Sequence, residues 1–194
     1  MPHPEPGTAA LLFDCDGTLV DTMDVHRSIW TEIFARYGFT ITDAWWEEYA
    51  NVALVPFVQA VIPDASEELA DDLNVEGMAR YLEVIHLAEP LEHVIEVARA
   101  HHGRLPMAVV TGGYREIIIP TLDAAGITHL FDVIVTADDV THSKPAPDVY
   151  ERAVTLLEVD PARCIAYEDS EIGMTSAQGA GIGRIIDIRL RTGW

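Results

Sequence analysis

Short apolar runs recur along the chain at intervals that suit buried strands. They span Ala9–Phe13, Met107–Val110, Val133–Thr136, Cys164–Tyr167 and Ile185–Ile188. Between them, apolar residues repeat with the period of an amphipathic helix. These helical segments are Leu91–Ala100, Tyr114–Ala125, Pro147–Leu157 and Ser170–Gln178. Such alternation predicts an α/β fold, a Rossmann-like parallel sheet of about five strands with helices on both faces.

One interval, between the first and second apolar runs, breaks this alternation. From residue 21 to residue 90 the pattern is helical, beginning with Asp24–Tyr37 and ending with Glu67–Ala88. The interval contains 14 acidic and 3 basic residues. We therefore predict two parts: a Rossmann-like core formed by residues 1–20 and 91–194, and an inserted small α-helical cap formed by residues 21–90.

Charge and composition narrow the range of partners. The 194 residues carry a formal net charge of −20, whereas a nucleic-acid partner needs a basic surface. We therefore do not expect nucleic acid as a partner. We do not expect a membrane either, since no apolar run approaches the roughly 18 residues of a membrane span. The start of the chain lacks the features of a signal peptide, and both cysteines lie in apolar segments, which predicts a cytoplasmic protein. The oligomeric state stays open, with a monomer as the working expectation.

Polar residues follow the ends of four predicted strands. In open α/β sheets, ligands bind beyond the carboxyl ends of the strands. Lys144, the single lysine of the chain, lies in the loop after the third strand. The other residues in question are Asp14 and Asp16 after the first strand, Thr111 and Gly112 after the second, and Glu168 and Asp169 after the fourth. We expect all of these groups to meet at one edge of the sheet.

The four carboxylates indicate a metal site. Asp14 and Asp16 lie two positions apart at a strand end, so both side chains can address one small volume. Close carboxylates require a cation between them or a raised pKa. With Glu168 and Asp169 they supply the oxygen ligands that Mg²⁺ favours. Such a cation would also reverse the repulsion between this acidic cluster and a phosphate dianion.

The remaining groups at this edge suit an anionic ligand. Thr111 and Gly112 can offer a hydroxyl and backbone N–H groups to phosphate oxygens, and Lys144 supplies a compact positive charge. A lone Asp-x-Asp or Thr-Gly-Gly is common in ordinary loops and turns. Their joint occurrence in this order, each at a strand end, predicts a site that binds phosphate and a metal.

These segments resemble the motifs of a known superfamily. Phe13–Thr22, with the sequence FDCDGTLVDT, resembles the first motif of the haloacid dehalogenase-like superfamily. Its second, third and fourth motifs resemble Val110–Gly112, Ser143–Pro147 and Tyr167–Ser170 with Gly173. The resemblance spans residues 10 to about 189. The position of the predicted cap is similar to that of the β-phosphoglucomutase-like branch, and the chain is most similar to bacterial fructose-1-phosphate and other phosphosugar phosphatases.

The resemblance implies roles for the acidic residues. Asp14 would attack phosphorus and form an aspartyl-phosphate. Asp16 would protonate the leaving alkoxide and then activate the hydrolytic water. The side chains of Asp14 and Asp169 and the backbone carbonyl of Asp16 would hold Mg²⁺, with Glu168 as a further ligand.

The resemblance also implies a substrate site. Thr111, Gly112 and Lys144 would bind the phosphoryl oxygens. His26 and Arg27, at the start of the cap, would face the pocket; an exposed helix face is the alternative for these two. The expected partner is a small-molecule phosphate ester.

Several activities fit this superfamily, and we expect a phosphatase that hydrolyses a sugar phosphate. Sugar-phosphate mutases of this branch grip a second phosphate with a cap arginine and lysine. The corresponding stretch, Asn51–Phe57, contains neither, so a mutase is the first alternative. A catalytically silent binding module is the second, although Asp14 and Asp16 are both present. Asp16 also disfavours a dehalogenase, because those relatives lack an acid/base aspartate there.

Overall fold

The chain divides into two compact units. A computed structural model describes residues 4–50 and 52–190. The sheet unit consists of Met1–Asp21 and Glu89–Trp194, and the helical unit consists of Thr22–Ala88. Among the described residues, no helix is long and apolar enough to cross a membrane.

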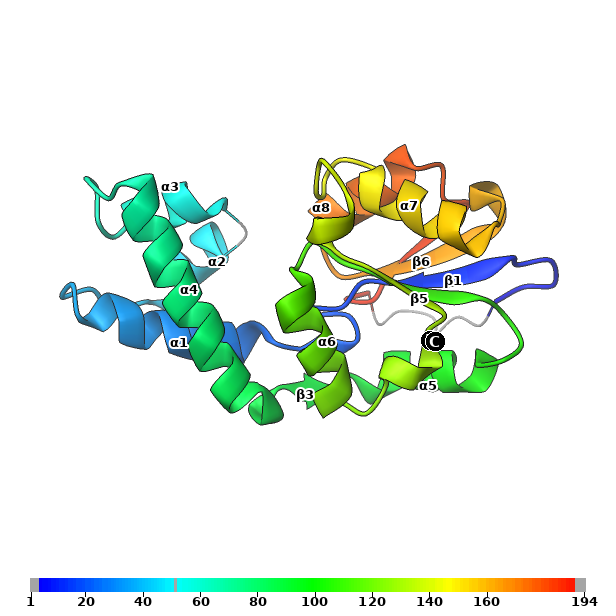
Figure 1. Cartoon of the computed structure of the whole chain (residues 1–194), viewed down its shortest axis with the longest axis horizontal. Coiled ribbons are helices and arrows are strands. Elements are labelled where there is room, and N and C mark those ends of the chain that lie inside the picture. The colour runs from blue at the N-terminus through cyan, green and yellow to red at the C-terminus, as the bar shows by residue number, and fades with distance from the viewer. Residues whose placement is uncertain (1–3, 51, 191–194) are drawn as a thin grey trace. The chain divides into compact units, whose positions relative to one another are not determined.

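A five-stranded parallel sheet forms the centre of the sheet unit, with strand order β5-β4-β1-β6-β7. Its strands are β1 (Ala10–Phe13), β4 (Met107–Val110), β5 (Val133–Val135), β6 (Cys164–Glu168) and β7 (Arg184–Asp187). The helices are α5 (Glu92–His101), α6 (Arg115–Ala124), α7 (Asp148–Leu157) and α8 (Glu171–Gly179). The first two cover one face of the sheet and the last two cover the other (Figure 1). The predicted fold class is confirmed.

Strand β1 lies at the centre of the sheet, and its side chains pack alternately on the two faces. Its four residues are fully buried. Ala10 and Leu12 belong to the apolar cluster that includes Tyr150 of α7. On the other face, the ring of Phe13 stacks on that of Tyr167, with 4.8 Å between the ring centroids. Because both faces are covered, the strand must be apolar at every position, which produces the continuous apolar run in the sequence.

Two very short strands connect the two units. β2 (Val20–Asp21) and β3 (Glu89–Pro90) form an antiparallel pair, in which Val20 is opposite Pro90. The backbone N–H of Leu91 donates a hydrogen bond to the carbonyl of Leu19, at 2.9 Å. The chain therefore leaves and re-enters the sheet unit along neighbouring paths. Strands of two residues carry no periodic signal, and the hydrophobic pattern did not predict them.

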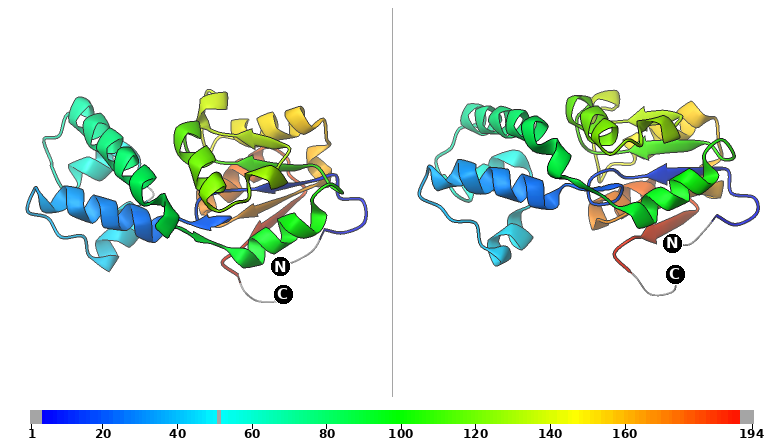
Figure 2. Two further views of the ribbon diagram at one scale, coloured as in Figure 1. Left: turned by 60° about the horizontal axis from the view of Figure 1, so that its bottom comes forward. Right: turned by 90° about the horizontal axis from the view of Figure 1, so that it is seen from below.

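The helical unit is held together by an aromatic cluster. Its helices are α1 (Met23–Ala35), α2 (Asp43–Tyr49), α3 (Leu54–Gln59) and α4 (Glu67–Val84). The helices α1 and α4 pack side by side (Figures 1 and 2), and Gly77 of α4 leaves room for Trp30 and Ile33 of α1. Phe57 of α3 is 6% exposed and contacts the rings of Trp30, Phe34 and Trp45.

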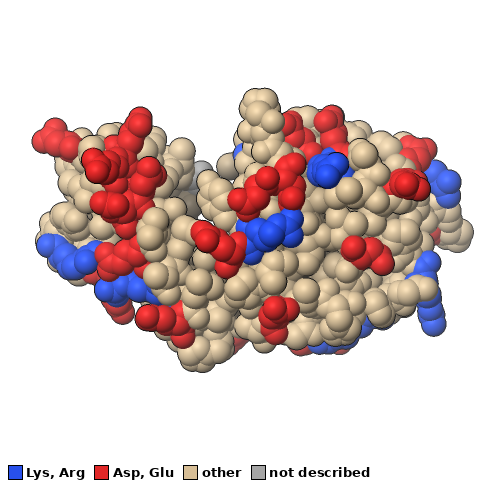
Figure 3. Space-filling model, in the orientation of Figure 1, with Lys and Arg blue, Asp and Glu red and all other residues tan. Residues whose placement is uncertain are grey.

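Charged side chains lie on the outside of this unit. Arg80 of α4 pairs with Glu32 of α1 at 2.6 Å, and Arg36 of α1 pairs with Glu76 of α4 at 2.7 Å. Acidic side chains dominate the face of the unit seen in Figure 3. Exposed ion pairs of this kind each contribute about 0–1 kcal/mol, so the apolar contacts supply most of the unit's stability.

Candidate active site

Asp14 lies directly after β1, at the carboxyl edge of the sheet. It is 7% exposed, and its backbone N–H donates to the carbonyl of Tyr167 in the neighbouring strand, at 3.0 Å. The chain then turns tightly, because the carbonyl of Cys15 accepts hydrogen bonds from the N–H groups of Leu19 and Val20 at 2.8 and 3.1 Å. This turn brings Asp16 back beside Val20. Both aspartates of the first motif are therefore held on one short loop.

Gly17 allows this loop to approach Asp169. Its φ of +77° lies in the left-handed region that favours glycine. A Cβ added to Gly17 would lie 2.2 Å from Oδ2 of Asp169. Glycine therefore serves two purposes here, namely the turn itself and the space for the Asp169 carboxylate.

Lys144 joins two of the strand ends. Its Nζ donates hydrogen bonds to Oδ1 of Asp14 at 2.7 Å and to Oε1 of Glu168 at 2.6 Å. The lysine side chain is 8% exposed and that of Glu168 is fully buried. Burial acts to lower the pKa of Lys144, but the two carboxylates outweigh it and raise that pKa above its ordinary value. The ammonium therefore stays charged, and it faces the residue proposed as the nucleophile.

Asp14, Glu168 and Asp169 form an acidic cluster. Each offers a carboxylate oxygen, and these oxygens lie within 4.8 Å of one another. Burial, followed by the charge of Asp14, raises the pKa of both Glu168 and Asp169 to about 7. Burial also raises the pKa of Asp14, in spite of its bond to Lys144. The single positive charge of Lys144 does not neutralise the three carboxylates of this cluster.

The donor set of this cluster fits a hard divalent cation. Only oxygen ligands are offered, as such ions require. Oε2 of Glu168 is buried and has no hydrogen-bond partner among the described residues, so a carboxylate oxygen is left available. The sequence hypothesis adds the backbone carbonyl of Asp16, which lies on the loop described above. The cluster can therefore bind a divalent metal.

Thr111 and Gly112 follow β4, which pairs with β1 in parallel. Thr111 is 1% exposed, and its Oγ1 accepts a hydrogen bond from the N–H of Gly113 at 3.0 Å. A Cβ on Gly112 would lie 3.2 Å from Oγ of Ser143. The turn after β4 thus lies beside the loop that carries Lys144, and its hydroxyl and N–H groups are at the same sheet edge as Asp14.

Two further residues lie around Glu168, and the sequence reasoning missed one of them, Tyr150. The hydroxyl of Tyr150, in α7, donates a hydrogen bond to Oε1 of Glu168 at 2.7 Å. Gly173, in the first turn of α8, leaves the space for the same carboxylate, because a Cβ there would lie 1.9 Å from Oε2. Tyr150 occupies the apolar face of an amphipathic helix and resembles an ordinary core residue. Gly173 belongs to the fourth motif, but the motif alone does not show that this glycine makes room for Glu168.

His26 and Arg27 lie in α1 of the helical unit. The ring of His26 stacks on that of Tyr81, with 4.7 Å between centroids. Arg27 forms an ion pair with the exposed Asp43. That both residues face the substrate stays a prediction. Asn51, the first residue of the cap stretch used to weigh the mutase, lies outside the described residues.

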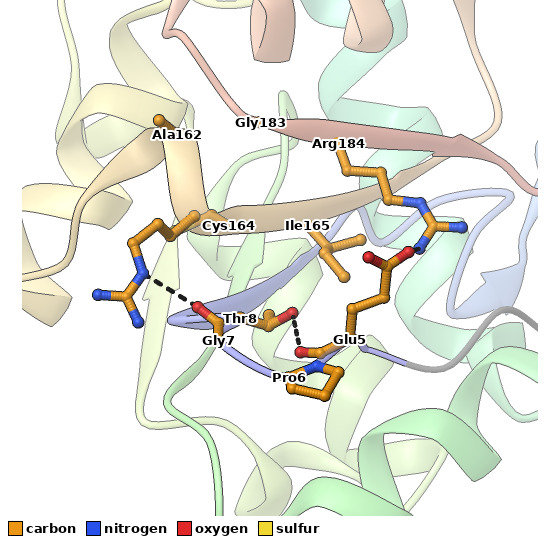
Figure 4. A pocket seen from close by; sticks show the side chains of 10 residues that line it. Glu5, Pro6, Gly7, Thr8, Ala162, Cys164, Ile165, Gly183 and Arg184 are labelled. Carbon is orange, nitrogen blue, oxygen red and sulfur yellow. Dashed lines mark hydrogen bonds and ion pairs between the residues drawn. The ribbon is translucent and has the colours of Figure 1, made fainter.

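A separate cavity of about 340 Å³ lies at the opposite ends of the strands (Figure 4). It is lined by residues that precede β1 and by the beginnings of β6 and β7. In it, Arg184 pairs with Glu5 at 3.1 Å, and Nε of Arg163 donates to the carbonyl of Gly7 at 3.0 Å. None of the predicted site residues lines this cavity.

The comparisons with known proteins identify the family. The haloacid dehalogenase-like hydrolase family matches residues 11–186, and the chain belongs to this family of enzymes. The chain is 35% identical over 189 residues to the fructose-1-phosphate phosphatase YqaB of Escherichia coli (strain K12), an alignment covering 94% of this chain and 97% of the relative. The membership predicted from the motifs is confirmed.

Two further relatives are informative. The validoxylamine A 7'-phosphate phosphatase of Streptomyces hygroscopicus subsp. limoneus is 31% identical, over 88% of this chain and 81% of the relative. Among solved structures, a mutant of CbbY from Rhodobacter sphaeroides, in complex with xylulose-1,5-bisphosphate, superposes with a TM-score of 0.79. That alignment has 26% identity and covers 92% of this chain and 85% of the other.

Proposed function

We propose that this enzyme is a Mg²⁺-dependent phosphatase that hydrolyses a small sugar phosphate through an aspartyl-phosphate on Asp14. The observation that carries the proposal is the environment of Asp14. Its carboxylate lies at the carboxyl edge of the sheet, 2.7 Å from Nζ of Lys144 and beside Glu168 and Asp169. A nucleophile, a cation for phosphoryl oxygens and a cluster of metal ligands thus converge in one small volume.

The first chemical step transfers the phosphoryl group to the enzyme. A carboxylate oxygen of Asp14 attacks phosphorus in line, and the bond between phosphorus and the ester oxygen breaks. Asp16 gives its proton to the departing alkoxide. Lys144, Thr111 and the N–H of Gly112 hold the phosphoryl oxygens while their charge redistributes. Mg²⁺, held by Asp14, Asp169, Glu168 and the Asp16 carbonyl, would neutralise negative charge on the transferring group.

The second step returns the enzyme to its starting state. The Asp16 carboxylate accepts a proton from water, whose oxygen attacks phosphorus. The acyl-phosphate bond breaks, inorganic phosphate is formed and the Asp14 carboxylate is restored. The same aspartate therefore acts once as an acid and once as a base, and its protonation state is correct for the following turnover.

A sugar phosphate is the substrate class that the relatives support. The similar Escherichia coli protein is named a fructose-1-phosphate phosphatase and aligns over nearly its full length. The CbbY structure with a TM-score of 0.79 was solved with a sugar bisphosphate. His26 and Arg27 are our candidates for contacts with the sugar, as the resemblance implies.

The test of this function is phosphate release from a panel of esters. The panel contains fructose 1-phosphate, 6-phosphogluconate, both glucose phosphates, glycolate phosphate and nucleotides, each with Mg²⁺ and with EDTA. We expect metal-dependent release that is concentrated on one or two sugar phosphates and is absent in Asp14→Asn. Release that persists in EDTA, or in Asp14→Asn, would contradict the mechanism.

A mutase remains the second candidate, because it would use the same phosphoenzyme. It would return the phosphoryl group to a second hydroxyl of the sugar instead of to water. Incubation with β-glucose 1-phosphate separates the two activities. Isomer formed without free phosphate identifies the mutase, whereas free phosphate identifies the phosphatase. If the protein turned over no ester, the catalytically silent binding module would be the one alternative that still fits.

A further inference from the structure

The Glu168 carboxylate is shared between two donors from different elements. Oε1 accepts hydrogen bonds from Nζ of Lys144 at 2.6 Å and from the hydroxyl of Tyr150 at 2.7 Å. Lys144 also lies over the Tyr150 ring, with 5.3 Å from Nζ to the ring centroid. Three groups therefore surround the Lys144 ammonium: the Tyr150 ring, the Glu168 carboxylate and the Asp14 carboxylate.

We propose that Tyr150 is a positioning residue for phosphate binding, because its hydroxyl shares the Glu168 carboxylate with Lys144 and so leaves the ammonium directed at Asp14 and the phosphoryl group. This inference rests on the proposed function, since it assigns Lys144 to phosphate. It adds a residue of α7 that is not part of any motif found in the sequence.

Asp14 and Glu168 compete for the charge of one ammonium, that of Lys144. A buried carboxylate that lacks other donors attracts its cation strongly, because water does not screen the pair. The Tyr150 hydroxyl supplies part of the stabilisation that Glu168 needs, as a hydrogen bond to a charged group does. Without this hydroxyl, Glu168 would draw Lys144 toward itself and away from Asp14.

The packing of the two partners supports a fixed geometry. Tyr150 and Glu168 are both fully buried. The other oxygen of Glu168 lies against Gly173, where a Cβ would be only 1.9 Å away. Gly173 thus gives the carboxylate room to lie against α8, and the tyrosine hydroxyl holds it from the side of α7.

The single lysine of the chain allows a direct test. Protein labelled with ¹³C and ¹⁵N in lysine gives one set of side-chain NMR signals, and they belong to Lys144. The variant Tyr150→Phe keeps the ring and removes the hydroxyl. The matched control is Tyr167→Phe, which removes a hydroxyl from an equally buried tyrosine next to Glu168 whose ring stacks on Phe13 on the other face of the sheet.

Two readouts are expected to change in Tyr150→Phe and to stay unchanged in Tyr167→Phe. The Cε and Nζ signals of Lys144 should move. The Kd of inorganic phosphate, measured by calorimetry in the presence of Mg²⁺, should rise about tenfold, the size expected for the loss of one hydrogen bond to a charged group. Unchanged signals and an unchanged Kd in Tyr150→Phe would overturn the proposal. Equal changes in both variants would also overturn it, because they would show a general effect of losing a buried hydroxyl.

A measurement on the wild-type protein keeps the proposal testable if Tyr150→Phe does not fold. The ε-methylene of Lys144 should show nuclear Overhauser contacts to one tyrosine ring and a ring-current shift, and their absence would overturn the proposal. None of these readouts uses turnover. A protein that hydrolyses no ester but shows the Lys144 shift and the weaker phosphate binding would refute the phosphatase and retain the positioning role.

Discussion

Gly17 illustrates how one residue couples a turn to the chemistry beside it. The left-handed φ of +77° is needed for the loop that carries Asp14 and Asp16. The missing Cβ is needed because Oδ2 of Asp169 occupies its place, at 2.2 Å. Gly126, at the end of α6, has a similar φ of +69° but no atom within 4 Å of an added Cβ. A substitution at Gly126 therefore introduces backbone strain alone, whereas one at Gly17 introduces the same strain and also displaces the Asp169 carboxylate.

Gly17→Ala should weaken the metal site, whereas Gly126→Ala should not. Both variants place alanine in the left-handed region and should lose about 1–2 kcal/mol of stability. Only Gly17→Ala also pushes Asp169 away, which should raise the Mg²⁺ concentration for half-maximal phosphate release by roughly 10- to 100-fold, as for other disturbances around metal ligands. Titration of activity with Mg²⁺ in both proteins measures this difference. Equal midpoints would show that Asp169 does not need the space at Gly17.

The candidate residues of the sheet unit were predictable because each lies at the end of a strand or in the loop that follows one. Parallel strands bring their carboxyl ends to one edge, so sequence order alone placed Asp14, Lys144 and Glu168 near one another. Their catalytic roles stay predictions. The contribution of Tyr150 was not predictable, since the apolar face of a helix accepts tyrosine for its ring alone, and the helical pattern does not show that the hydroxyl meets Glu168 at the end of the next strand. Tertiary structure decides such pairs.

At the scale of whole elements, the sequence predicted the strands and helices of the sheet unit to within one or two residues. Continuous apolar runs identified the buried strands, and amphipathic periodicity identified the helices. The pair β2–β3 was missed because two residues cannot display a period. In the helical unit, the ranges Asp24–Tyr37 and Glu67–Ala88 correspond to α1 and α4. The short helices α2 and α3 have seven and six residues, too few for a distinct periodic signal, so the stretch between those ranges was predicted only as helical in general.

Phe57→Ala should destabilise the helical unit selectively. Phe57 is 6% exposed and contacts several aromatic rings, and loss of such a side chain costs about 3–5 kcal/mol. Three of the four tryptophans, Trp30, Trp45 and Trp46, lie in this unit. Urea unfolding followed by tryptophan fluorescence should therefore shift to lower denaturant, while the Lys144 NMR signal of the sheet unit should shift less.

The control for this prediction is Leu82→Ala in the same unit. Leu82 is 41% exposed, so its loss should change stability by only about 0.5 kcal/mol. A Phe57→Ala transition that coincides with that of Leu82→Ala would show that the aromatic cluster does not hold the unit together. Equal shifts of the fluorescence and Lys144 transitions would show that the two units unfold as one.

At the scale of the whole molecule, the net charge of −20 opposes the binding of an anionic substrate. The attraction provided by Lys144 and a bound metal acts at short range, whereas the net charge acts over about 10 Å or more at low ionic strength. Salt should therefore assist encounter with a phosphate dianion. In an enzyme with a positively charged surface around its site, salt has the opposite effect.

We expect kcat/KM for a sugar phosphate to rise about two- to fivefold between about 0.01 M and 0.15 M ionic strength, because screening weakens this repulsion. The experiment uses KCl at a fixed and saturating Mg²⁺ concentration. At saturating substrate, kcat should stay constant, since the field acts on the approach of the substrate. A steady fall in kcat/KM with salt would show that attraction at the site dominates even at long range.

The central claim, that Asp14 becomes phosphorylated, is tested most directly by mass spectrometry of the Asp16→Asn variant. With p-nitrophenyl phosphate and Mg²⁺, the good leaving group departs without an acid, whereas hydrolysis of the intermediate lacks its base. We predict that acid-quenched Asp16→Asn protein gains the mass of one phosphoryl group, located on the peptide that contains Asp14, and that the gain is absent when Asp14→Asn is added. Turnover by the wild type with no adduct on Asp14 in Asp16→Asn would contradict the account.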